Sequence, residues 1–261
     1  MKNFTILIYK QILQKFKKEN YSFFTLEQYC SNKILPEHFI ILRHDIDRKP
    51  KNALKIAKLE NELCIKSSYY FRIGKESNQP EIIKQIAELG HEIGYHYEDL
   101  AIAKGDYNKA IKQFENNLNY FRKFYPVKTM CMHGSPLSKW DNRDLWEKYD
   151  YRKYGIICEP YFDLDFNKVF YVTEAGRSWN NEKVSIRDKV ESKFNISIHS
   201  TDDIIKLLQS KNGFRQIMIS THPHNWAKTE MEWWKIYLWQ SIKNIVKRAI
   251  IKIKKNSSKV A

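Results

Sequence analysis

The sequence predicts an α/β protein in which parallel strands alternate with helices. The chain has 261 residues, enough for one large domain with its own hydrophobic core. Hydrophobic residues make up 43% and charged residues 29%, which is typical of globular proteins and excludes a disordered or collagen-like chain. Short apolar runs alternate with helical patterns between residues 38 and 220. This alternation indicates βαβ units and therefore a parallel sheet.

The first half of the chain contains four of the expected strands, at residues 38–43, 67–72, 91–95 and 129–132. A helix is expected to begin at Pro50, because proline suits the first turn. A second runs from Pro80 to Leu89 and ends at Gly90, a favoured C-terminal cap. A third begins near Asp106 and carries one apolar stripe, formed by Ile111, Phe114, Leu118 and Phe121.

The second half continues the same pattern, with strands expected at residues 153–158, 169–172 and 215–220. A helix capped by Thr201 is expected to end at Gly213. We divide the chain into an N-terminal helical extension, a barrel, and a basic amphipathic helix with its tail, at residues 1–37, 38–228 and 229–261.

The net charge of +15 is distributed unevenly. After Glu232 there are eight Lys or Arg residues and no acidic residue. Such an excess favours nucleic acid, anionic lipid or an anionic substrate, or it reflects a chain that is rich in lysine throughout. The helix expected from Trp233 places apolar residues on one side: Ile236, Trp239, Ile242, Val246, Ile250 and Ile253. It could lie on an anionic membrane, or its first half could pack on the barrel.

The four cysteines have no paired spacing of the zinc-ribbon or redox kind, and they are Cys30, Cys64, Cys131 and Cys158. We therefore expect reduced, mostly buried thiols and a cytoplasmic protein. Peripheral contact with a membrane through the C-terminal helix is the alternative location. The apolar run at residues 4–9 is too short for a signal peptide or a membrane span.

Polar residues gather at the ends of four expected strands, within residues 43–47, 91–99, 133–136 and 221–226. Six of the eight histidines lie in these segments. Strand ends of a parallel barrel share one face, and active sites are built on that face. The sequence therefore predicts a functional cluster of histidines and carboxylates there.

Asp and His side chains with an open coordination position are typical of a hydrolytic site for zinc or a similar divalent ion. Side chains alternate along a strand, so Arg43, Asp45 and Asp47 share a face while His44 points away. One carboxylate can then bind the metal and the other can act as a base. For His44 we expect core packing.

These segments resemble the polysaccharide deacetylase superfamily (NodB homology, carbohydrate esterase family 4). Residues 42–47, 90–96 and 221–224 are similar to its first, second and last motifs. The resemblance covers about residues 38 to 226 and implies a distorted (β/α)7 barrel with one divalent metal, most simply zinc. It implies that Asp45 is the base, that Asp47 and His96 are metal ligands, and that a histidine of the last motif, His222 or His224, is the general acid.

The chain departs from this family pattern at three places. The expected second metal-binding histidine is replaced by Leu100, with Asp99 one place short, and Ile46 separates the two acidic residues of the first motif. The third motif lacks its arginine. We therefore expect His133, or a histidine of the last motif, to be the third ligand, and Arg43 to orient Asp45.

Four further residues are candidates for contacting or orienting the substrate: Asp99, Arg177, Trp179 and Trp226. The first motif, residues 42–47, is most similar to the branch of this superfamily found among surface polysaccharide biosynthesis proteins. This resemblance implies metal-dependent removal of an N- or O-acyl group from a saccharide precursor of surface polysaccharide, either a sugar nucleotide or a lipid-linked sugar. One alternative is a catalytically degenerate barrel that binds saccharide or assists an assembly complex. Another is a basic nucleic-acid-binding protein, although no nucleic-acid-binding motif is present.

Overall fold

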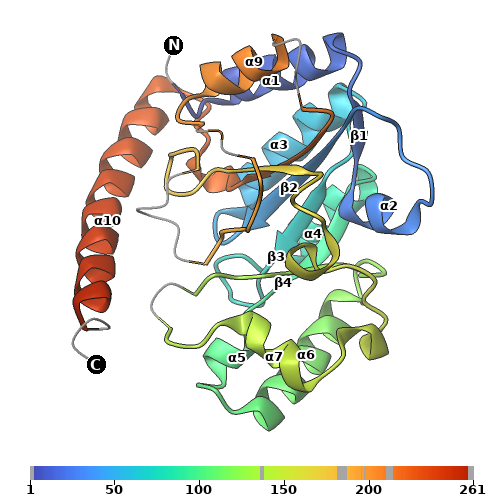
Figure 1. Cartoon of the computed structure of the whole chain (residues 1–261), viewed down its shortest axis with the longest axis vertical. Coiled ribbons are helices and arrows are strands. Elements are labelled where there is room, and N and C mark those ends of the chain that lie inside the picture. Colours follow the sequence, from blue (N-terminus) through green and yellow to red (C-terminus); the bar gives the residue numbers. More distant parts are fainter. Residues whose placement is uncertain are drawn as a thin grey trace.

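The protein is described by a computed structural model that covers residues 3–135, 138–180, 187–194, 196, 198–209 and 214–257. Pro136 of the third polar segment and the expected helix end at Gly213 lie outside these residues. In the described chain, parallel strands form a sheet that curls into a half-barrel (Figure 1). This confirms the predicted α/β class and the distorted barrel.

Seven strands make up the sheet within the described residues: β1 Ser22–Phe24, β2 Phe39–Ile46, β3 Ser68–Phe71, β4 Glu92–Tyr97, β5 Met130–Met132, β6 Phe170–Thr173 and β7 Gln216–Thr221. Their order is β5-β4-β3-β2-β7-β6, and β1 pairs with the start of β2 in the register Ser22↔Phe39. The central strand β2 therefore lies between β3 and β7 where its polar end begins, with Arg43 paired to Ser68 and Ser220.

The longer helices are α1 Ile6–Lys18, α3 Pro50–Glu62, α4 Pro80–Glu88, α6 Tyr107–Phe121, α9 Thr201–Gln209 and α10 Glu230–Ser257. Shorter ones are α2 Leu26–Ser31, α5 Asp99–Ile102, α7 Leu145–Lys148 and α8 Pro160–Asp163, with 3-10 turns at Asn142–Asp144, Tyr151–Tyr154 and Pro223–Asn225. The helix starts expected at Pro50 and Pro80 are confirmed. Gly90 follows α4 at φ 81°, a left-handed conformation that glycine adopts readily.

Two local expectations differ from the structure. Residues 153–158 do not form a strand, because Asp150 accepts a hydrogen bond from the backbone of Arg152 and starts a 3-10 turn that Gly155 ends. What remains of the expected strand is an isolated bridge between Thr129 and Cys158. Conversely, β1 has three residues and is too short to give a periodic signal.

The sheet separates two kinds of environment because neighbouring residues of β2 face opposite sides. Ile40 and Leu42 pack outward with α1 and α9, whereas Phe39 and Ile41 face inward with Met218 of β7. The polar end continues this alternation, which directs Arg43 and Asp45 inward and His44 outward. His44 is buried and pairs with Glu60 of α3 (Nε2–Oε1 2.8 Å) and with Thr221 (2.7 Å), so it packs in the core as expected.

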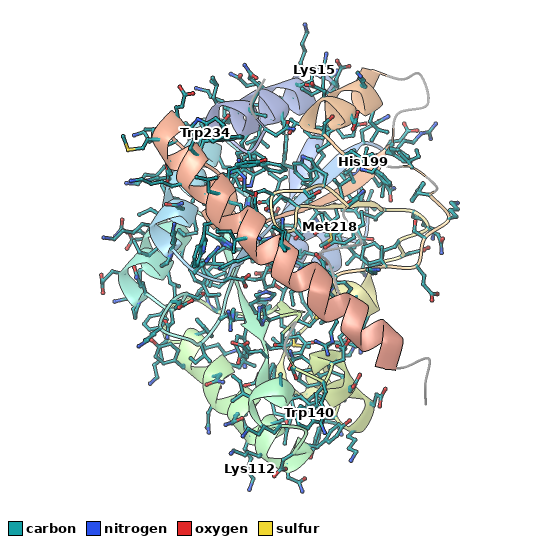
Figure 2. The ribbon with its side chains drawn as sticks, turned by 90° about the vertical axis from the view of Figure 1, so that its left-hand side faces the viewer. Lys15, Lys112, Trp140, His199, Met218 and Trp234 are labelled. Carbon is teal, nitrogen blue, oxygen red and sulfur yellow. A yellow bond between two sulfur atoms is a disulfide. The ribbon has the colours of Figure 1, made fainter. Side chains whose placement is uncertain are left out.

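Helix α10 runs along the outside of the molecule (Figures 1 and 2). Its inner side is attached through Trp233, which donates to the carbonyl of Asn3 at 2.7 Å, and through Asn244, which donates to the carbonyl of Gly176 at 2.9 Å. The predicted apolar stripe is not a single face. Ile236 is buried, while Trp239 and Ile242 are exposed; the side chains of Val246, Ile250 and Ile253 lie outside the described residues. Within the described chain, no helix is long and apolar enough to traverse a bilayer.

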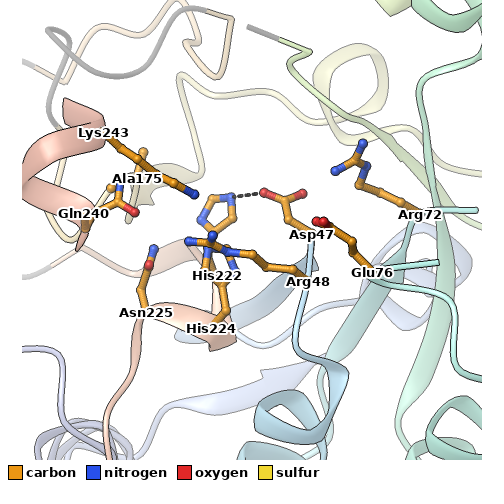
Figure 3. A pocket seen from close by; sticks show the side chains of 11 residues that line it. Asp47, Arg48, Arg72, Glu76, Ala175, His222, His224, Asn225, Gln240 and Lys243 are labelled. Carbon is orange, nitrogen blue, oxygen red and sulfur yellow. Dashed lines mark ion pairs between the residues drawn. The ribbon is translucent and has the colours of Figure 1, made fainter. Parts of the chain in front are cut away.

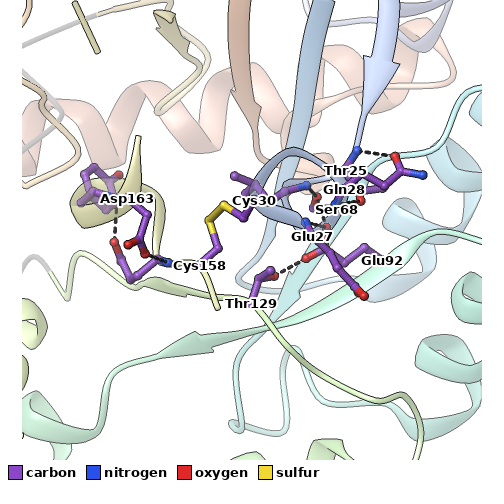
Figure 4. Close-up of a disulfide and its surroundings, with 12 residues drawn as sticks. Thr25, Glu27, Gln28, Cys30, Ser68, Glu92, Thr129, Cys158 and Asp163 are labelled. Carbon is purple, nitrogen blue, oxygen red and sulfur yellow. Dashed lines mark hydrogen bonds between the residues drawn. A yellow bond between two sulfur atoms is a disulfide. The ribbon is translucent and has the colours of Figure 1, made fainter. Parts of the chain in front are cut away.

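A disulfide joins Cys30 of α2 to Cys158, with 6.2 Å between their Cα atoms (Figure 4). The expectation of four reduced cysteines is therefore wrong for this pair. The two residues are 128 positions apart, and local spacing carries no signal for a pairing that the fold creates. Cys64 and Cys131 are free thiols, the first exposed and the second buried.

Candidate active site

The inward end of β2 holds a buried ion pair. Arg43 donates to both oxygens of Asp45, from Nε at 2.8 Å and from Nη2 at 2.6 Å. Burial raises the pKa of Asp45, but Arg43 and then His96 outweigh it and bring the pKa to about 2. Asp45 is therefore ionised and fixed in orientation at neutral pH, which is the arrangement expected for Arg43.

Arg43 is also held through its third nitrogen, Nη1. Its Nη1 lies 3.4 Å from the hydroxyls of both Tyr161 and Tyr171, and both hydroxyls donate to Asp188. Thr173 at the end of β6 also donates to Asp188, at 2.6 Å. This network fixes the guanidinium without competing for Asp45.

Three imidazoles surround Asp47. The Nε2 atoms of His96 and His133 lie 3.8 and 3.5 Å from Asp47 Oδ1, and Nε2 of His222 lies 3.8 Å from Oδ2. Burial raises the pKa of Asp47, but His133, His222 and His96 hold it well below its ordinary range. Its Oδ1 is buried and has no hydrogen-bond partner in the described part of the chain. The structure therefore brings together side chains from the ends of β2, β4, β5 and β7.

Each of these imidazoles is oriented through its other ring nitrogen. Nδ1 of His96 lies 2.9 Å from the carbonyl of Cys131, and Nδ1 of His133 lies 2.9 Å from Glu98 Oε2. Nδ1 of His222 lies 2.7 Å from the carbonyl of Glu174. When Nδ1 of a neutral imidazole is engaged in this way, Nε2 is left to bind a metal, and metal-binding histidines in proteins are generally held like this.

The donor types of Asp47, His96 and His133 suit a divalent metal. Two ligand atoms at 2.0–2.1 Å from a tetrahedral zinc lie about 3.3 Å apart, and the distances of 3.5 and 3.8 Å from Asp47 Oδ1 to His133 and His96 are somewhat longer than this. Burial lowers the pKa of His96 to about 4, which keeps its imidazole neutral and able to coordinate. A bound ion would give the unpartnered Asp47 Oδ1 a partner.

In the described part of the chain, the group whose ligand atoms all lie within 4.8 Å of one another consists of Asp45, His96 and Cys131. Burial raises the pKa of the Cys131 thiol well above its ordinary value, and a thiol binds a metal as its thiolate. The group around Asp47 therefore has the more suitable donor types, whereas the group around Cys131 has the closer ligand atoms.

The pKa values of His222 and His224 are shifted in opposite directions. Burial lowers the pKa of His222, but its hydrogen bond to Glu174 and the charge of Asp47 outweigh this and raise it to about 10. Burial lowers the pKa of His224 well below its ordinary value. His222 can therefore donate a proton at neutral pH, whereas His224 is neutral and lies with it in the wall of a cavity of about 250 Å³ (Figure 3).

Four expected substrate-contacting residues are not brought to this cluster. Asp99 is buried beneath it, where Tyr95 and Asn117 donate to its carboxylate. The others pack against the N-terminal segment: Trp179 and Trp226 contact Phe4, and the guanidinium of Arg177 lies 5.6 Å from the same ring. They support the wall of the site rather than face it.

Sequence reasoning did not single out two acidic residues that position the histidines. Glu98 binds both His133 and Arg72, with Arg72 Nη2 2.7 Å away. Glu174 accepts from the backbone of His222 at 3.0 Å and from Asn225 at 3.0 Å. Glu98 and Glu174 both follow the ends of predicted strands, and this position in the sequence could have identified them as site residues.

The arrangement as a whole belongs to the class of candidate hydrolytic metal centres at the strand ends of an α/β half-barrel.

Comparison of the sequence with models of known families and with curated proteins finds no match. The solved structures that are similar to this chain include two from Bacillus subtilis. One is a mutant of the peptidoglycan deacetylase PdaC, with 13% identity, coverage of 81% of this chain and 97% of that chain, and a TM-score of 0.39. The other is PdaA, a family 4 carbohydrate esterase, with 12% identity, coverage of 89% and 83%, and a TM-score of 0.38.

Proposed function

We propose that the protein is a metal-dependent hydrolase that removes an N- or O-acyl group from a saccharide precursor of surface polysaccharide. The observation that carries this proposal is the convergence of three oriented imidazoles on Asp47, next to a carboxylate held by Arg43. Structural ion pairs do not require this combination of an unpartnered carboxylate oxygen and free Nε2 atoms.

Asp47, His96 and His133 would hold the metal. When bound there, such an ion would supply polarisation of the acyl carbonyl and a water molecule whose pKa is lowered to about 7. Glu98 keeps the Nε2 atom of His133 directed at the site, and the carbonyl of Cys131 does the same for His96.

Asp45 would act as the base, because it is ionised and lies next to His96 (3.9 Å). It removes a proton from the attacking water as the oxygen–carbon bond forms. His222 then donates its Nε2 proton to the leaving nitrogen or oxygen as the acyl bond breaks. The products are a carboxylic acid and the deacylated sugar.

Metal analysis tests the ligand set. We expect about one equivalent of a divalent metal in the native protein and a loss of affinity of about tenfold or more in His96→Ala and in His133→Ala. His199→Ala is the matched control, because His199 is exposed and distant in sequence from every motif. Full metal content in both site variants would remove the assignment.

Acetate release tests the reaction. The substrates are acetylated sugar nucleotides and acetylated lipid-linked sugars, assayed with native protein and with Asp45→Asn. The variant should retain the metal and lose about 10²–10⁴-fold in rate, because it lacks a general base. A native protein that binds metal but releases no acetate from either class would favour the catalytically degenerate alternative.

A further inference from the structure

The cavity beside Asp47 contains buried polar atoms that the hydrolytic centre does not use. His224 Nδ1 and Asn225 Oδ1 have no hydrogen-bond partner among the described residues, and both residues line the cavity. Buried polar atoms in folded proteins are almost always hydrogen-bonded. A polar ligand in the cavity would give these two atoms a hydrogen-bond partner.

Two cations point into the same space (Figure 3). Arg48 follows β2, and Lys243 comes from α10. Arg72 differs from them, because it lies on the other side of Asp47 and is bound to Glu98.

Arg48 has no ion-pair partner in the part of the chain that the structure describes. Of the two carboxylates that line the cavity, Asp47 belongs to the proposed metal site and Glu76 lies beside Arg72 (Figure 3). The end of the cavity near His222 and His224 is therefore positively charged. An arginine fork and a lysine ammonium together are well suited to the oxygens of a phosphoryl group.

We propose that this end of the cavity is a subsite for a phosphoryl group attached to the acylated sugar. Arg48 and Lys243 bind the phosphoryl oxygens, and His224 and Asn225 bind sugar hydroxyls. At about 250 Å³ the cavity is smaller than most ligand pockets, which matches one sugar ring with its phosphate rather than a stretch of polymer. That the sugar carries an acyl group rests on the proposed function. Sugar nucleotides and lipid diphosphate sugars both contain a phosphoryl group attached to the sugar.

Calorimetric titration of the full chain tests the subsite, with inorganic phosphate, N-acetylglucosamine 1-phosphate and N-acetylglucosamine as probes. We expect the two phosphates to bind, and each of Arg48→Ala and Lys243→Ala to weaken them about tenfold, with little change for the neutral sugar. Lys235→Ala is the matched control, since Lys235 is exposed on the same helix. Repeating the titrations after chelation separates binding by the cations from binding by a metal.

Phosphate affinity that is absent, or that is equal in native protein and both cavity variants, would overturn the subsite. If phosphate binding depends on Arg48 and Lys243 but no acetate is released from any substrate, the subsite stands and the proposed reaction is rejected. Competition by UDP-N-acetylglucosamine against a lipid-linked N-acetylglucosamine diphosphate in detergent then distinguishes the two sources of the phosphoryl group.

A separate feature of the molecule is the outer face of α10. Large apolar side chains recur there at intervals of three or four residues and are 48–68% exposed: Met231, Trp234, Leu238, Ile242 and Ile245. Trp239 and Tyr237 are exposed beside them. An apolar face of this kind, on one helix turn after another, marks an interaction surface.

We infer that this outer face docks on an anionic membrane surface. Tryptophan and tyrosine among aliphatic residues are characteristic of helices that lie in the membrane interface. Besides Lys243 of the cavity, seven basic residues follow Glu232 in the sequence with no acidic residue among them, and they complement anionic lipid. The same charges repel a second copy of this helix, which makes a self-associated dimer the weaker alternative.

Vesicle sedimentation of the full chain tests this surface. Native protein should bind phosphatidylglycerol vesicles, less at high salt, and bind phosphatidylcholine vesicles weakly. Leu238→Glu with Ile242→Glu should reduce the bound fraction about tenfold, whereas Ile34→Glu should not, because Ile34 is 90% exposed but lies before β2. Equal sedimentation of native protein and the α10 variant, or a dimer in light scattering that the α10 variant abolishes, would overturn the inference.

Discussion

Replacing Arg43 with methionine should lower the free energy of unfolding by about 3–5 kcal/mol, because it leaves the charge of Asp45 buried without its partner. Asp45 is 2% exposed, and both of its oxygens accept from the guanidinium. In the native protein its pKa falls from 3.8 to about 2. That difference corresponds to about 2 kcal/mol. It is a minimum for the favourable interaction of Asp45 with Arg43 and His96, because burial acts in the opposite direction.

The sign of the pH dependence follows from the lowered pKa. The stabilising contribution is complete above pH 4 and is lost as the pH falls through the folded pKa of about 2. At pH 7 the whole effect of Arg43→Met should therefore be visible. Urea unfolding followed by circular dichroism, with a chelator present, measures it without a contribution from bound metal.

The double variant with Asp45→Asn provides the decisive comparison. Neither charge then remains at the end of β2. The decrease in the free energy of unfolding should therefore be at least about 2 kcal/mol smaller than the sum of the decreases in the two single variants. If the single losses add to within about 0.5 kcal/mol, the two side chains are not coupled and the account of Asp45 is wrong.

Three further variants probe the surroundings of the site. Glu98→Gln should weaken metal binding about 10–100-fold by releasing His133, measured by competition with a chelating dye; unchanged affinity would show that Glu98 does not orient the ligand. Asp99→Asn should stabilise the protein by up to about 4 kcal/mol at pH 8 and much less at pH 4. Burial raises the pKa of Asp99 from 3.8 to about 7, so its favourable contribution exists below pH 4 and is lost as the pH rises through 7; equal effects at both pH values would contradict this. Cys30→Ser should cost about 5 kcal/mol under oxidising conditions, because the disulfide to Cys158 closes a loop of 128 residues, and the loss should disappear in reductant.

The main positions of the site could be predicted because they depend on local rules. Alternation along a strand directs Arg43 and Asp45 to one face and His44 to the other, and the structure has this arrangement. Parallel strands place their carboxyl ends together, which brings His96 and His222 toward Asp47 although they are far apart in sequence.

The remaining features depend on tertiary contacts that a local pattern does not contain. The loop after β6 folds back so that Glu174 bridges Trp179, and the indole is then buried against Phe4 from the start of the chain. Asp99 begins α5, and this turn directs its carboxylate to Asn117. Trp179 and Asp99 lie at the expected positions in the sequence, but their side chains point away from the site. The segments that they contact, at Phe4 and Asn117, are far from them in the sequence, so a local pattern does not predict these contacts.

The packing of α10 against the cavity couples the position of this helix to the charge of the cavity. Gly176 lines the cavity at φ 62°, and a methyl group there would lie 2.7 Å from Asn244 Oδ1. Since Lys243 is carried by the same helix turn, any event that lifts α10 also withdraws a cation from the cavity. Because coupling between two binding equilibria is reciprocal, a ligand bound by Lys243 would stabilise the packed position of α10 by the same free energy.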